Sequence, residues 1–278
     1  MNLIDFEKVL TIGAGGQVGS YVDFGLRPDS KTLDITNELQ VEQYIQEHKP
    51  QVIIHLAAAA DMARAEREPQ YVYDINVRGT YNVARAARKV GAIMVYASSS
   101  RVFKGDKNGP YTETDTPEPE TQYGQTKHIG ELIVSQLVPR YIIARTAWVF
   151  GGGPERDNKF YGRVIKQLQS GKSEVVALND VYGSPTYGKD YIQTIKTLLE
   201  EGRVGTYHIA NAGVATRYDI AQVLATTMFP DATVQAVDRT YFPGATSLPA
   251  NESIVSANCT LRDWREALAE YIEEEWMV

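Results

Sequence analysis

The sequence predicts an α/β protein built on a Rossmann-type doubly wound parallel sheet, with a smaller C-terminal substrate lobe. Four apolar or β-branched runs lack polar alternation, which is typical of strands buried on both faces of such a sheet. They lie at residues 8–12, 52–56, 93–97 and 141–144. Helix-like stretches separate them, at residues 38–47, about 70–90 and about 123–138. Strand and helix therefore alternate over the first two thirds of the chain, as a doubly wound fold requires.

The segment after the first predicted strand is unusually short. The first strand ends in a glycine cluster, and only 14 residues separate Gly19 from Asp34. These residues have to hold a helix, a turn and a second strand, so we expect a first helix of about two turns and a stunted second strand. The later helix at 70–90 is better marked, because apolar and aromatic side chains recur there at spacings of three and four: Tyr73, Val77, Tyr81 and Ala84.

The pattern changes after Phe150. A Gly-Gly-Gly-Pro break at 151–154 is followed by shorter strand-like runs at 175–178 and 206–209. Helix-like stretches follow near residues 160–170, 190–200 and 218–227. We expect a dinucleotide-binding domain over 1–150 and a substrate-binding lobe over most of 151–278, with some segments returning to the first domain.

Composition restricts the partners and the compartment. The chain has 278 residues, a formal net charge of −7 and one cysteine. The acidic balance argues against nucleic acid or an anionic membrane as a partner, because phosphate groups bind to basic faces. The longest apolar run, 52–60, has nine residues, and a membrane span needs about 20. A single cysteine and an N-terminus without a basic segment predict a cytoplasmic protein.

The end of the chain is strongly acidic. Residues 262–278 hold six acids against two arginines, which predicts a solvated amphipathic last helix. A homodimer through this helix is allowed by the sequence but not required by it. The histidines His55, His128 and His208 are far apart and lack metal-ligand spacing, so we expect no metal site.

A candidate cofactor site follows the first strand directly. Glycines at 13, 16 and 19 leave room for a tight turn and for a pyrophosphate to approach the backbone, although a purely structural turn would look the same. Asp34 lies 21 residues after Gly13, close to where an acid meets the adenosine half of a dinucleotide, or it is a turn residue. Arg27 and Lys31 nearby could neutralise a 2′-phosphate, so NAD and NADP both remain candidates.

A candidate catalytic set lies further along the chain. Tyr123 and Lys127 are four residues apart on a predicted helix and share one of its faces. An adjacent ammonium is expected to lower the pKa of the tyrosine, which would let it exchange a proton with a sugar or alcohol oxygen. Ser99 follows the predicted strand at 93–97, at the carboxyl end of a strand, where open α/β sheets bind ligands. Residues 109–120, with four acids and three prolines, form either a solvated loop or a flap over this site.

These motifs together resemble the dTDP-4-dehydrorhamnose reductase family, a branch of the extended short-chain dehydrogenase/reductases. The resemblance runs over nearly the whole chain, through GAGGQVG, LDIT, VIIHLAAAAD, VYASSSRVFKG, YGQTKHIGE, ARTAWVFG, DNKF, NDVYGSPTY and GTYHIANAG. It implies that Tyr123 is the proton donor, that Lys127 orients it and binds the nicotinamide ribose, and that Ser99 polarises the carbonyl group. The implied cofactor contacts are Gly13, Gly16, Gln17, Val18, Gly19, Asp34, Ile35, Ala57, Ala58, Tyr123 and Lys127. The implied substrate contacts are Ser99, Ser100, Arg101, Trp148 and Asn158.

The chain departs from the family in places that face the sugar. The family usually has Thr-Asp-Tyr where this chain has Ser99-Ser100-Arg101, and Arg-Pro where it has Leu248-Pro249. The expected reaction is reduction of a 4-keto-6-deoxy nucleotide sugar with NADPH or NADH. Two alternatives stay open, a sugar-nucleotide 4-epimerase and a non-catalytic dinucleotide-binding regulatory subunit.

Overall fold

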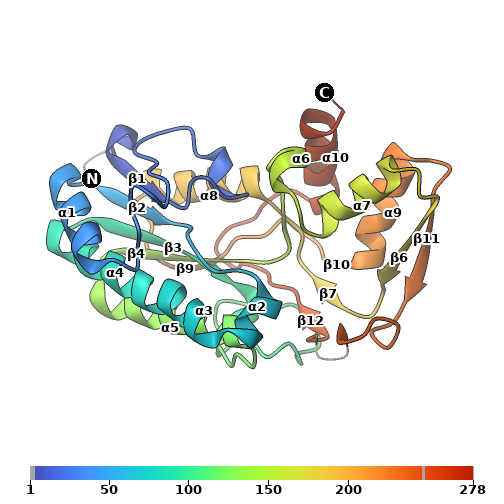
Figure 1. Cartoon of the computed structure of the whole chain (residues 1–278), viewed down its shortest axis with the longest axis horizontal. Helices are drawn as coiled ribbons and strands as arrows, with labels where there is room; N and C mark the ends of the chain where they lie inside the picture. Colours follow the sequence, from blue (N-terminus) through green and yellow to red (C-terminus); the bar gives the residue numbers. More distant parts are fainter. Residues whose placement is uncertain (1–3, 246–247, 278) are drawn as a thin grey trace.

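A five-stranded parallel sheet forms the larger part of the molecule. The computed structural model describes residues 4–245 and 248–277. The strands run in the order β1-β2-β3-β4-β9, and every neighbouring pair is parallel (Figure 1). They are β1 (Val9–Ile12), β2 (Val52–His55), β3 (Ile93–Ser99), β4 (Tyr141–Thr146) and β9 (Gly205–His208). The predicted α/β class with a parallel Rossmann-type sheet is confirmed.

Helices cover both faces of this sheet. On one face, α1 (Glu38–His48), α4 (Thr80–Val90) and α5 (Gln122–Leu137) bury apolar side chains against the strands. The opposite face packs against α8 (Gly188–Glu200), through residues such as Tyr191 and Ile195. Because apolar helix faces cover both sides, the strands are buried without polar alternation, as their sequences predict.

Local signals explain where these helices begin and end. The Asn37 side chain accepts a hydrogen bond from the Gln40 backbone N–H and caps α1, and Thr121 caps α5 in the same way through Gly124. Gly91 ends α4 in the left-handed conformation, which glycine adopts without steric cost. The predicted helix at 70–90 is an interrupted one: α3 (Pro69–Tyr73), a π-helical segment η3 (Asp74–Gly79) and α4.

The region after β1 differs from the prediction. We expected a helix of about two turns, but the chain forms only the 3-10 turn η2 (Gly19–Tyr21). The expected second strand is reduced to one bridge, between Leu26 and Leu10. The reason is length: the glycine turn, the bridge at Leu26 and the turn at 30–32 use the residues up to Leu33, and none remain for a longer helix.

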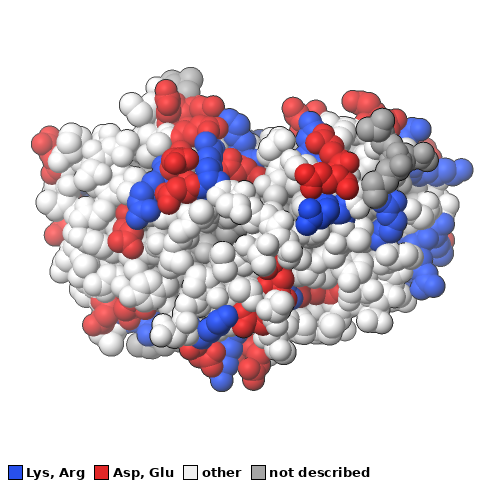
Figure 2. Space-filling model, turned by 180° about the vertical axis from the view of Figure 1, so that it is seen from behind, with Lys and Arg blue, Asp and Glu red and all other residues white. Residues whose placement is uncertain are grey.

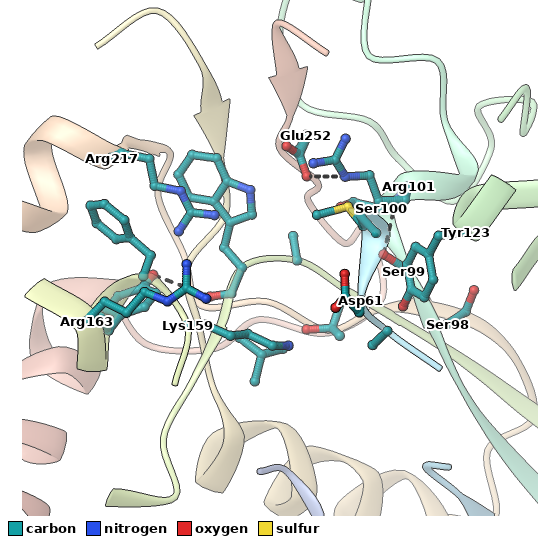
Figure 3. Close-up of a pocket in the computed structure, with 18 residues that line it drawn as sticks. Asp61, Ser98, Ser99, Ser100, Arg101, Tyr123, Lys159, Arg163, Arg217 and Glu252 are labelled. Carbon is teal, nitrogen blue, oxygen red and sulfur yellow. Dashed lines mark hydrogen bonds and ion pairs between the residues drawn. The ribbon is translucent and has the colours of Figure 1, made fainter. Parts of the chain in front are cut away.

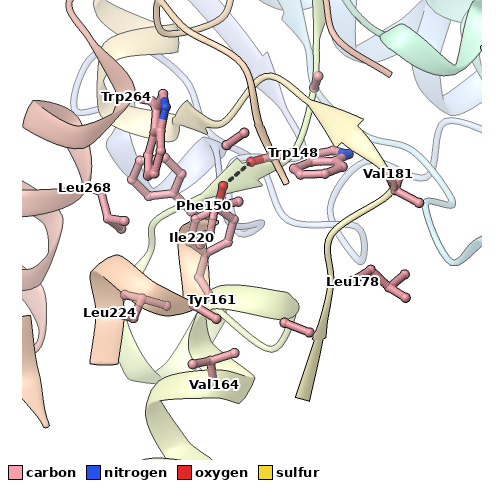
Figure 4. Packing of buried hydrophobic residues seen from close by; sticks show 14 of the residues in the cluster. Trp148, Phe150, Tyr161, Val164, Leu178, Val181, Ile220, Leu224, Trp264 and Leu268 are labelled. Atoms are coloured by element: carbon pink, nitrogen blue, oxygen red, sulfur yellow. Dashed lines mark hydrogen bonds between the residues drawn. The ribbon is translucent and has the colours of Figure 1, made fainter. Parts of the chain in front are cut away.

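A second, smaller lobe lies beside the carboxyl ends of the strands (Figure 1). Its short sheets pair β6 (Glu174–Leu178) with β11 (Thr233–Val237), β5 (Val149–Phe150) with β8 (Thr186–Tyr187), and β7 (Tyr182–Gly183) with both β10 (Ala215–Thr216) and β12 (Asn251–Glu252). Its helices are α6 (Gly153–Arg156), α7 (Phe160–Gln169), α9 (Arg217–Met228) and α10 (Trp264–Glu275). Aromatic and aliphatic side chains of these elements form one core, which includes Trp148, Phe150, Tyr161 and Trp264 (Figure 4).

The remaining elements are short: η1 (Phe6–Lys8), α2 (Met62–Arg67) and η4 (Ser100–Val102). The last helix, α10, is amphipathic as predicted, because Trp264, Leu268 and Tyr271 are buried while most of its acids face outward. On the face shown in Figure 2, acidic and basic side chains are interspersed. None of the described helices is long and apolar enough to cross a lipid bilayer.

Candidate active site

A cavity of about 700 Å³ lies between the sheet and the smaller lobe. Its walls come from the carboxyl ends of β3 and β4, from the start of α5 and from the smaller lobe, which is where open α/β sheets bind ligands. Figure 3 shows Ser99, Tyr123 and Arg101 on one side, and Arg163 and Arg217 on the other. The lining residues are Ala60, Asp61, Met62, Ser98, Ser99, Ser100, Arg101, Tyr123, Thr146, Ala147, Trp148, Val149, Lys159, Phe160, Tyr161, Arg163, Arg217 and Glu252.

Two elements bring Ser99 and Tyr123 together. Ser99 is the last residue of β3, and its hydroxyl accepts a hydrogen bond from the Arg101 backbone N–H at 3.2 Å. Tyr123 lies in the first turn of α5, one residue before Gly124. A Cβ atom on Gly124 would lie 2.2 Å from the Arg101 carbonyl oxygen, so only glycine lets the helix approach the serines this closely.

The pKa of Tyr123 is raised by its surroundings. Burial raises the pKa of Tyr123 above its ordinary value of 10.0, while hydrogen bonding with Ser99 and the charge of Arg101 oppose the rise. We expected the Lys127 ammonium to lower this pKa; the net shift is upward instead, because burial outweighs the opposing contacts, and the charge among those contacts is that of Arg101. At neutral pH the phenol keeps its proton, and the group can supply that proton to a ligand oxygen.

Lys127 is buried one turn further along α5. Its side chain is 3% exposed, and its ammonium lies 4.0 Å from the centroid of the Tyr96 ring. Burial lowers the pKa of Lys127 to about 7, and the carboxylate of Glu131 opposes the shift. A lysine whose pKa lies near 7 is only partly charged at neutral pH, so a ligand that binds beside it can change its charge.

Asn76 ties the loop after β2 to this helix. Its amide nitrogen donates to Thr126 Oγ1 at 3.0 Å, and its amide oxygen accepts from the Ala59 backbone N–H at 2.8 Å. The same loop contains Ala57 and Ala58. Asn76 therefore fixes the distance between the expected cofactor contacts and the helix that carries Tyr123.

A buried ion pair lies beneath the serines. Glu131 on α5 accepts two hydrogen bonds from the Arg145 guanidinium, both at 2.8 Å, and one from the Ser98 hydroxyl at 2.5 Å. These contacts lower the pKa of Glu131 to about 2 in spite of its burial. The network joins β3, β4 and α5 next to Ser99 and the start of α5.

Four cations face the cavity: Arg101, Lys159, Arg163 and Arg217. Arg101 is buried and pairs with Glu252 at 2.8 Å. Arg217 lies 3.8 Å from the centroid of the Trp148 ring and 4.8 Å from that of Phe160. Stacking on two rings holds this guanidinium in place without a carboxylate partner among the described residues.

Trp148 combines a strained backbone with an indole N–H that makes no hydrogen bond in the described structure. Its φ is 38°, a region that side-chain-bearing residues rarely occupy and that often marks a functional site. Its indole Nε1 is buried without a hydrogen-bond partner in the described structure, and so is Thr146 Oγ1. Both atoms belong to residues of the cavity wall, so both can bond to a ligand there.

Comparison with known proteins identifies the family. The sequence matches the RmlD substrate binding domain family over residues 7–277. A dTDP-4-dehydrorhamnose reductase of Mycobacterium tuberculosis is 31% identical over 283 residues, covering 95% of this chain and 91% of the relative. The spore coat polysaccharide biosynthesis protein SpsK of Bacillus subtilis is 30% identical, covering 96% and 97%.

The chain belongs to the RmlD family.

Solved structures agree. The dTDP-4-dehydrorhamnose reductase of Bacillus anthracis, in complex with NADP, has a TM-score of 0.90, 33% identity, and coverage of 96% of this chain and 98% of that one. The UDP-glucose 4-epimerase of Thermus thermophilus has a TM-score of 0.75 at 17% identity, which shows the shared fold alone. The predicted membership of the extended short-chain dehydrogenase/reductases is thus confirmed.

The glycine-rich loop divides into two kinds of position in this RmlD family member. A Cβ atom on Gly13, whose φ is 90°, would lie 2.6 Å from the Ala57 nitrogen, and one on Gly19 would lie 2.5 Å from Ala14 Cα. Both glycines are therefore required by packing. Gly15 has no atom within 4 Å of such a Cβ, and Gly16 has only the Gly13 carbonyl oxygen at 3.4 Å. The fold does not need these two glycines, and their open surroundings fit a pyrophosphate against the backbone.

Other predicted site residues take different places. Asp34 is exposed, and its carboxylate accepts from the Thr36 backbone N–H at 2.9 Å and from the Thr36 hydroxyl at 2.8 Å, as a turn residue does. Ile35 is buried in the core under α1. Asn158 does not line the cavity: its side chain bonds to Lys166 and to the Glu155 carbonyl oxygen. Its neighbour Lys159 lies at the cavity instead.

The loop at 109–120 is anchored. Tyr111 is buried against Phe103, and its hydroxyl accepts hydrogen bonds from three consecutive backbone N–H groups, those of residues 105 to 107. Glu113 accepts from the His208 backbone N–H at 3.0 Å. These bonds fix the loop beside the cleft and favour the first of the two predictions, a solvated loop. No group of acids, histidines and cysteines that could hold a metal is found in the described chain.

Proposed function

We propose that this protein is an NAD(P)H-dependent ketoreductase that reduces a 4-keto-6-deoxyhexose bound to a nucleoside diphosphate. One observation carries the proposal: Ser99 and Tyr123 converge on a cavity that also holds four cations, in a chain whose net charge is −7. Proton donors suit a carbonyl oxygen, and a cationic pocket in an acidic protein suits a diphosphate. Family membership supports the same activity, since several relatives are named dTDP-4-dehydrorhamnose reductase.

The bound dinucleotide supplies the hydride that reduces the carbonyl carbon. Tyr123 donates its phenolic proton to the carbonyl oxygen, and the Ser99 hydroxyl donates a second hydrogen bond to that oxygen. The Lys127 ammonium stabilises the phenolate as it forms and binds the ribose next to the nicotinamide. The raised pKa of Tyr123 suits this direction of reaction, because the acid is protonated before the hydride arrives.

We propose that the four cations of the cavity, Arg101, Lys159, Arg163 and Arg217, form a cationic wall that holds the substrate. We assign the diphosphate to Arg217, Lys159 and Arg163, and the sugar to the space between Trp148 and the serines. Arg101 replaces a residue that the family usually has as tyrosine, and its pairing with Glu252 places a fixed charge beside the sugar. This pair and the two unbonded polar atoms, Trp148 Nε1 and Thr146 Oγ1, are the features that we expect to select the sugar.

The proposed location and assembly follow from the same features. We propose a cytoplasmic enzyme, because one free cysteine, Cys259, and a soluble nucleotide substrate suit a reducing compartment. We also propose that residues 1–150, together with α8 and β9, form the dinucleotide-binding unit, and that the rest of 151–277 forms the substrate lobe. A homodimer stays a prediction.

The decisive experiment follows the absorbance of NADPH and NADH with purified protein and freshly made dTDP-4-keto-6-deoxy-L-hexose. We expect oxidation of the cofactor by the wild type and a rate at least about a hundredfold lower for Tyr123→Phe. Dinucleotide binding without oxidation would overturn the proposal. Interconversion of 4-epimers without net cofactor turnover would then indicate an epimerase, and no turnover of any sugar nucleotide a regulatory subunit.

A further inference from the structure

The glycine-rich loop is braced from the far end of the chain. In a Rossmann unit the helix after this loop normally holds it in place, but here only the three-residue turn η2 follows. Gln17 of the loop and Tyr21 of η2 instead reach the smaller lobe. Gln17 Nε2 donates to the Gly151 carbonyl oxygen at 3.0 Å, and the Tyr21 hydroxyl accepts from the Gly152 backbone N–H at 2.5 Å.

Tyr21 also joins the loop to the last helix. Its hydroxyl donates to Glu275 Oε1 at 2.5 Å, and the Tyr187 hydroxyl donates to the same oxygen at 2.7 Å. The two tyrosine rings meet edge to face, with centroids 5.6 Å apart. In the described chain the Glu275 carboxylate therefore contacts hydroxyl groups rather than a lysine or arginine.

The protein leaves room for this tyrosine at two glycines. A Cβ atom on Gly151 would lie 2.4 Å from the Tyr21 hydroxyl oxygen, and one on Gly188 would lie 2.7 Å from Tyr21 Cε2. Three segments thus contact the Tyr21 side chain: the chain after β5, the start of α8 and the end of α10. Packing this specific would be unnecessary for an exposed turn with no role.

The last helix is rigid enough to act as a brace. Its apolar face is buried in the core of the smaller lobe, and the Tyr271 hydroxyl donates to Asp157 at 2.9 Å. On its outer face, Lys189 from α8 pairs with Glu270 at 2.6 Å and with Glu274 at 2.7 Å. These contacts hold both sides of the helix close to its last residue, Glu275.

We propose that Tyr21 and Glu275 are positioning residues for the dinucleotide, so that the last helix of this chain performs the task of the missing first helix. The inference rests on the proposed placement of the dinucleotide at residues 13–19. Without the Tyr21–Glu275 hydrogen bond the loop loses its order before the cofactor binds, and binding has to restore it.

The test measures the Kd of NADPH by its fluorescence, without any sugar nucleotide, for Tyr21→Phe and Glu275→Met. We expect the Kd to rise about tenfold in each variant, which corresponds to about 1.4 kcal/mol. We expect Glu275→Gln, which keeps an acceptor oxygen, to stay within about threefold of the wild type. The effects of the two substitutions should be less than additive in the double variant, because both remove the Tyr21–Glu275 hydrogen bond.

The control is Glu273→Gln, which alters an exposed carboxylate on the same helix and should leave the Kd unchanged. In the assay with sugar nucleotide, the KM for NADPH should rise in Tyr21→Phe, while kcat at saturation stays within about twofold. An unchanged Kd in folded Tyr21→Phe would overturn the inference even if Glu275→Met fails to fold. A wild type that binds NADPH but reduces no sugar would overturn the proposed reaction alone, and one that binds no dinucleotide would overturn both.

Discussion

The Lys127 ammonium rests on the face of the Tyr96 ring, 4.0 Å from its centroid, in a site that water hardly reaches. The ring replaces only part of the hydration that the ammonium has lost, so burial still lowers its pKa to about 7. The fold therefore tolerates a group that destabilises it, because the proposed reaction needs that group.

We expect Lys127→Met to stabilise the protein while it destroys activity. The shift of the pKa from 10.5 to about 7 corresponds to a folding penalty on the order of 4 kcal/mol, and methionine fills a similar volume without a charge. Thermal and urea unfolding at pH 7 in the absence of dinucleotide should show a gain of about 2 to 4 kcal/mol. The wild type should also become more stable between pH 7 and 10, because there the unfolded chain holds a proton that the folded chain has lost. A variant less stable than the wild type would contradict this account.

The same lysine should set the alkaline limb of the reductase reaction. We expect kcat/KM for NADPH to fall above an apparent pKa of about 7, since the neutral amine cannot stabilise the Tyr123 phenolate. The tyrosine itself should not limit this range, because its pKa is raised above 10.0. A pH–rate profile of Lys127→Arg, which keeps its charge, should lack this limb. A limb that persists unchanged in the arginine variant would assign the ionisation to another group.

Acid should weaken the fold through two buried groups. Glu131 has a pKa lowered to about 2, so its contribution is complete above its ordinary value of 4.5 and is lost as the pH falls toward 2. His55 is buried with a pKa lowered to about 3, so only the unfolded chain takes up its proton as the pH falls below 6.5. We expect the free energy of unfolding to fall steadily below pH 6.5.

Glu131→Gln should lower the free energy of unfolding by about 3 kcal/mol at pH 7, because Arg145 stays buried without its partner. The variant should also show a flatter decline of stability below pH 4.5. Urea unfolding at several pH values measures both effects.

Arg217→Ala should weaken substrate binding rather than slow the chemical step. Loss of the guanidinium stacked on Trp148 removes a diphosphate contact, and we expect KM for the sugar nucleotide to rise about ten- to a hundredfold with kcat much less affected. Binding of dTDP alone, measured by calorimetry, should weaken by the same factor. The matched control is Arg88→Ala, an exposed arginine on α4. Equal affinity for dTDP in Arg217→Ala and the wild type would remove Arg217 from the proposed site.

Two glycines of the same loop should respond in opposite ways. Gly13→Ala should fail to fold or lose several kcal/mol, because its φ is 90° and the added methyl group collides with the Ala57 backbone. Gly16→Ala should keep the melting temperature and raise the Kd of NADPH, because only a ligand needs the space above it. If Gly16→Ala bound NADPH as tightly as the wild type, the pyrophosphate would have to lie elsewhere.

Much of this architecture was predictable because its signals are local. The parallel strands appear as unbroken apolar runs, and Tyr123 and Lys127 share a helix face at a spacing of four. The length of the first helix was overestimated because the glycine turn itself uses the residues that a helix would need. For Asp34 its distance to Gly13 left two interpretations, a cofactor contact or a turn residue, and the two hydrogen bonds that its Oδ1 accepts from Thr36 favour the turn residue.

The cationic wall was missed because it is assembled by tertiary packing. Arg217 and Glu252 come from elements far along the chain, and no spacing in the sequence relates them to Ser99. A signal for Arg217 does exist: it is the first residue of α9, where the helix dipole disfavours a cation. Such a local conflict in an otherwise well-capped helix indicates a role outside the helix. At the start of α7 it is Lys159, next to the predicted Asn158, that lines the cavity, and no local pattern in the sequence distinguishes these two neighbours.

The buried pair of Arg101 and Glu252 has a consequence for how quickly ligands arrive. It connects η4, beside the sheet, to β12 in the smaller lobe, so the two lobes cannot swing apart without exposing both charges. Because the width of the cleft is fixed, ligand binding does not require the lobes to open first. The association rate of an anionic nucleotide should then be set by diffusion and by the attraction of the cationic wall, and it should slow steeply as salt is added.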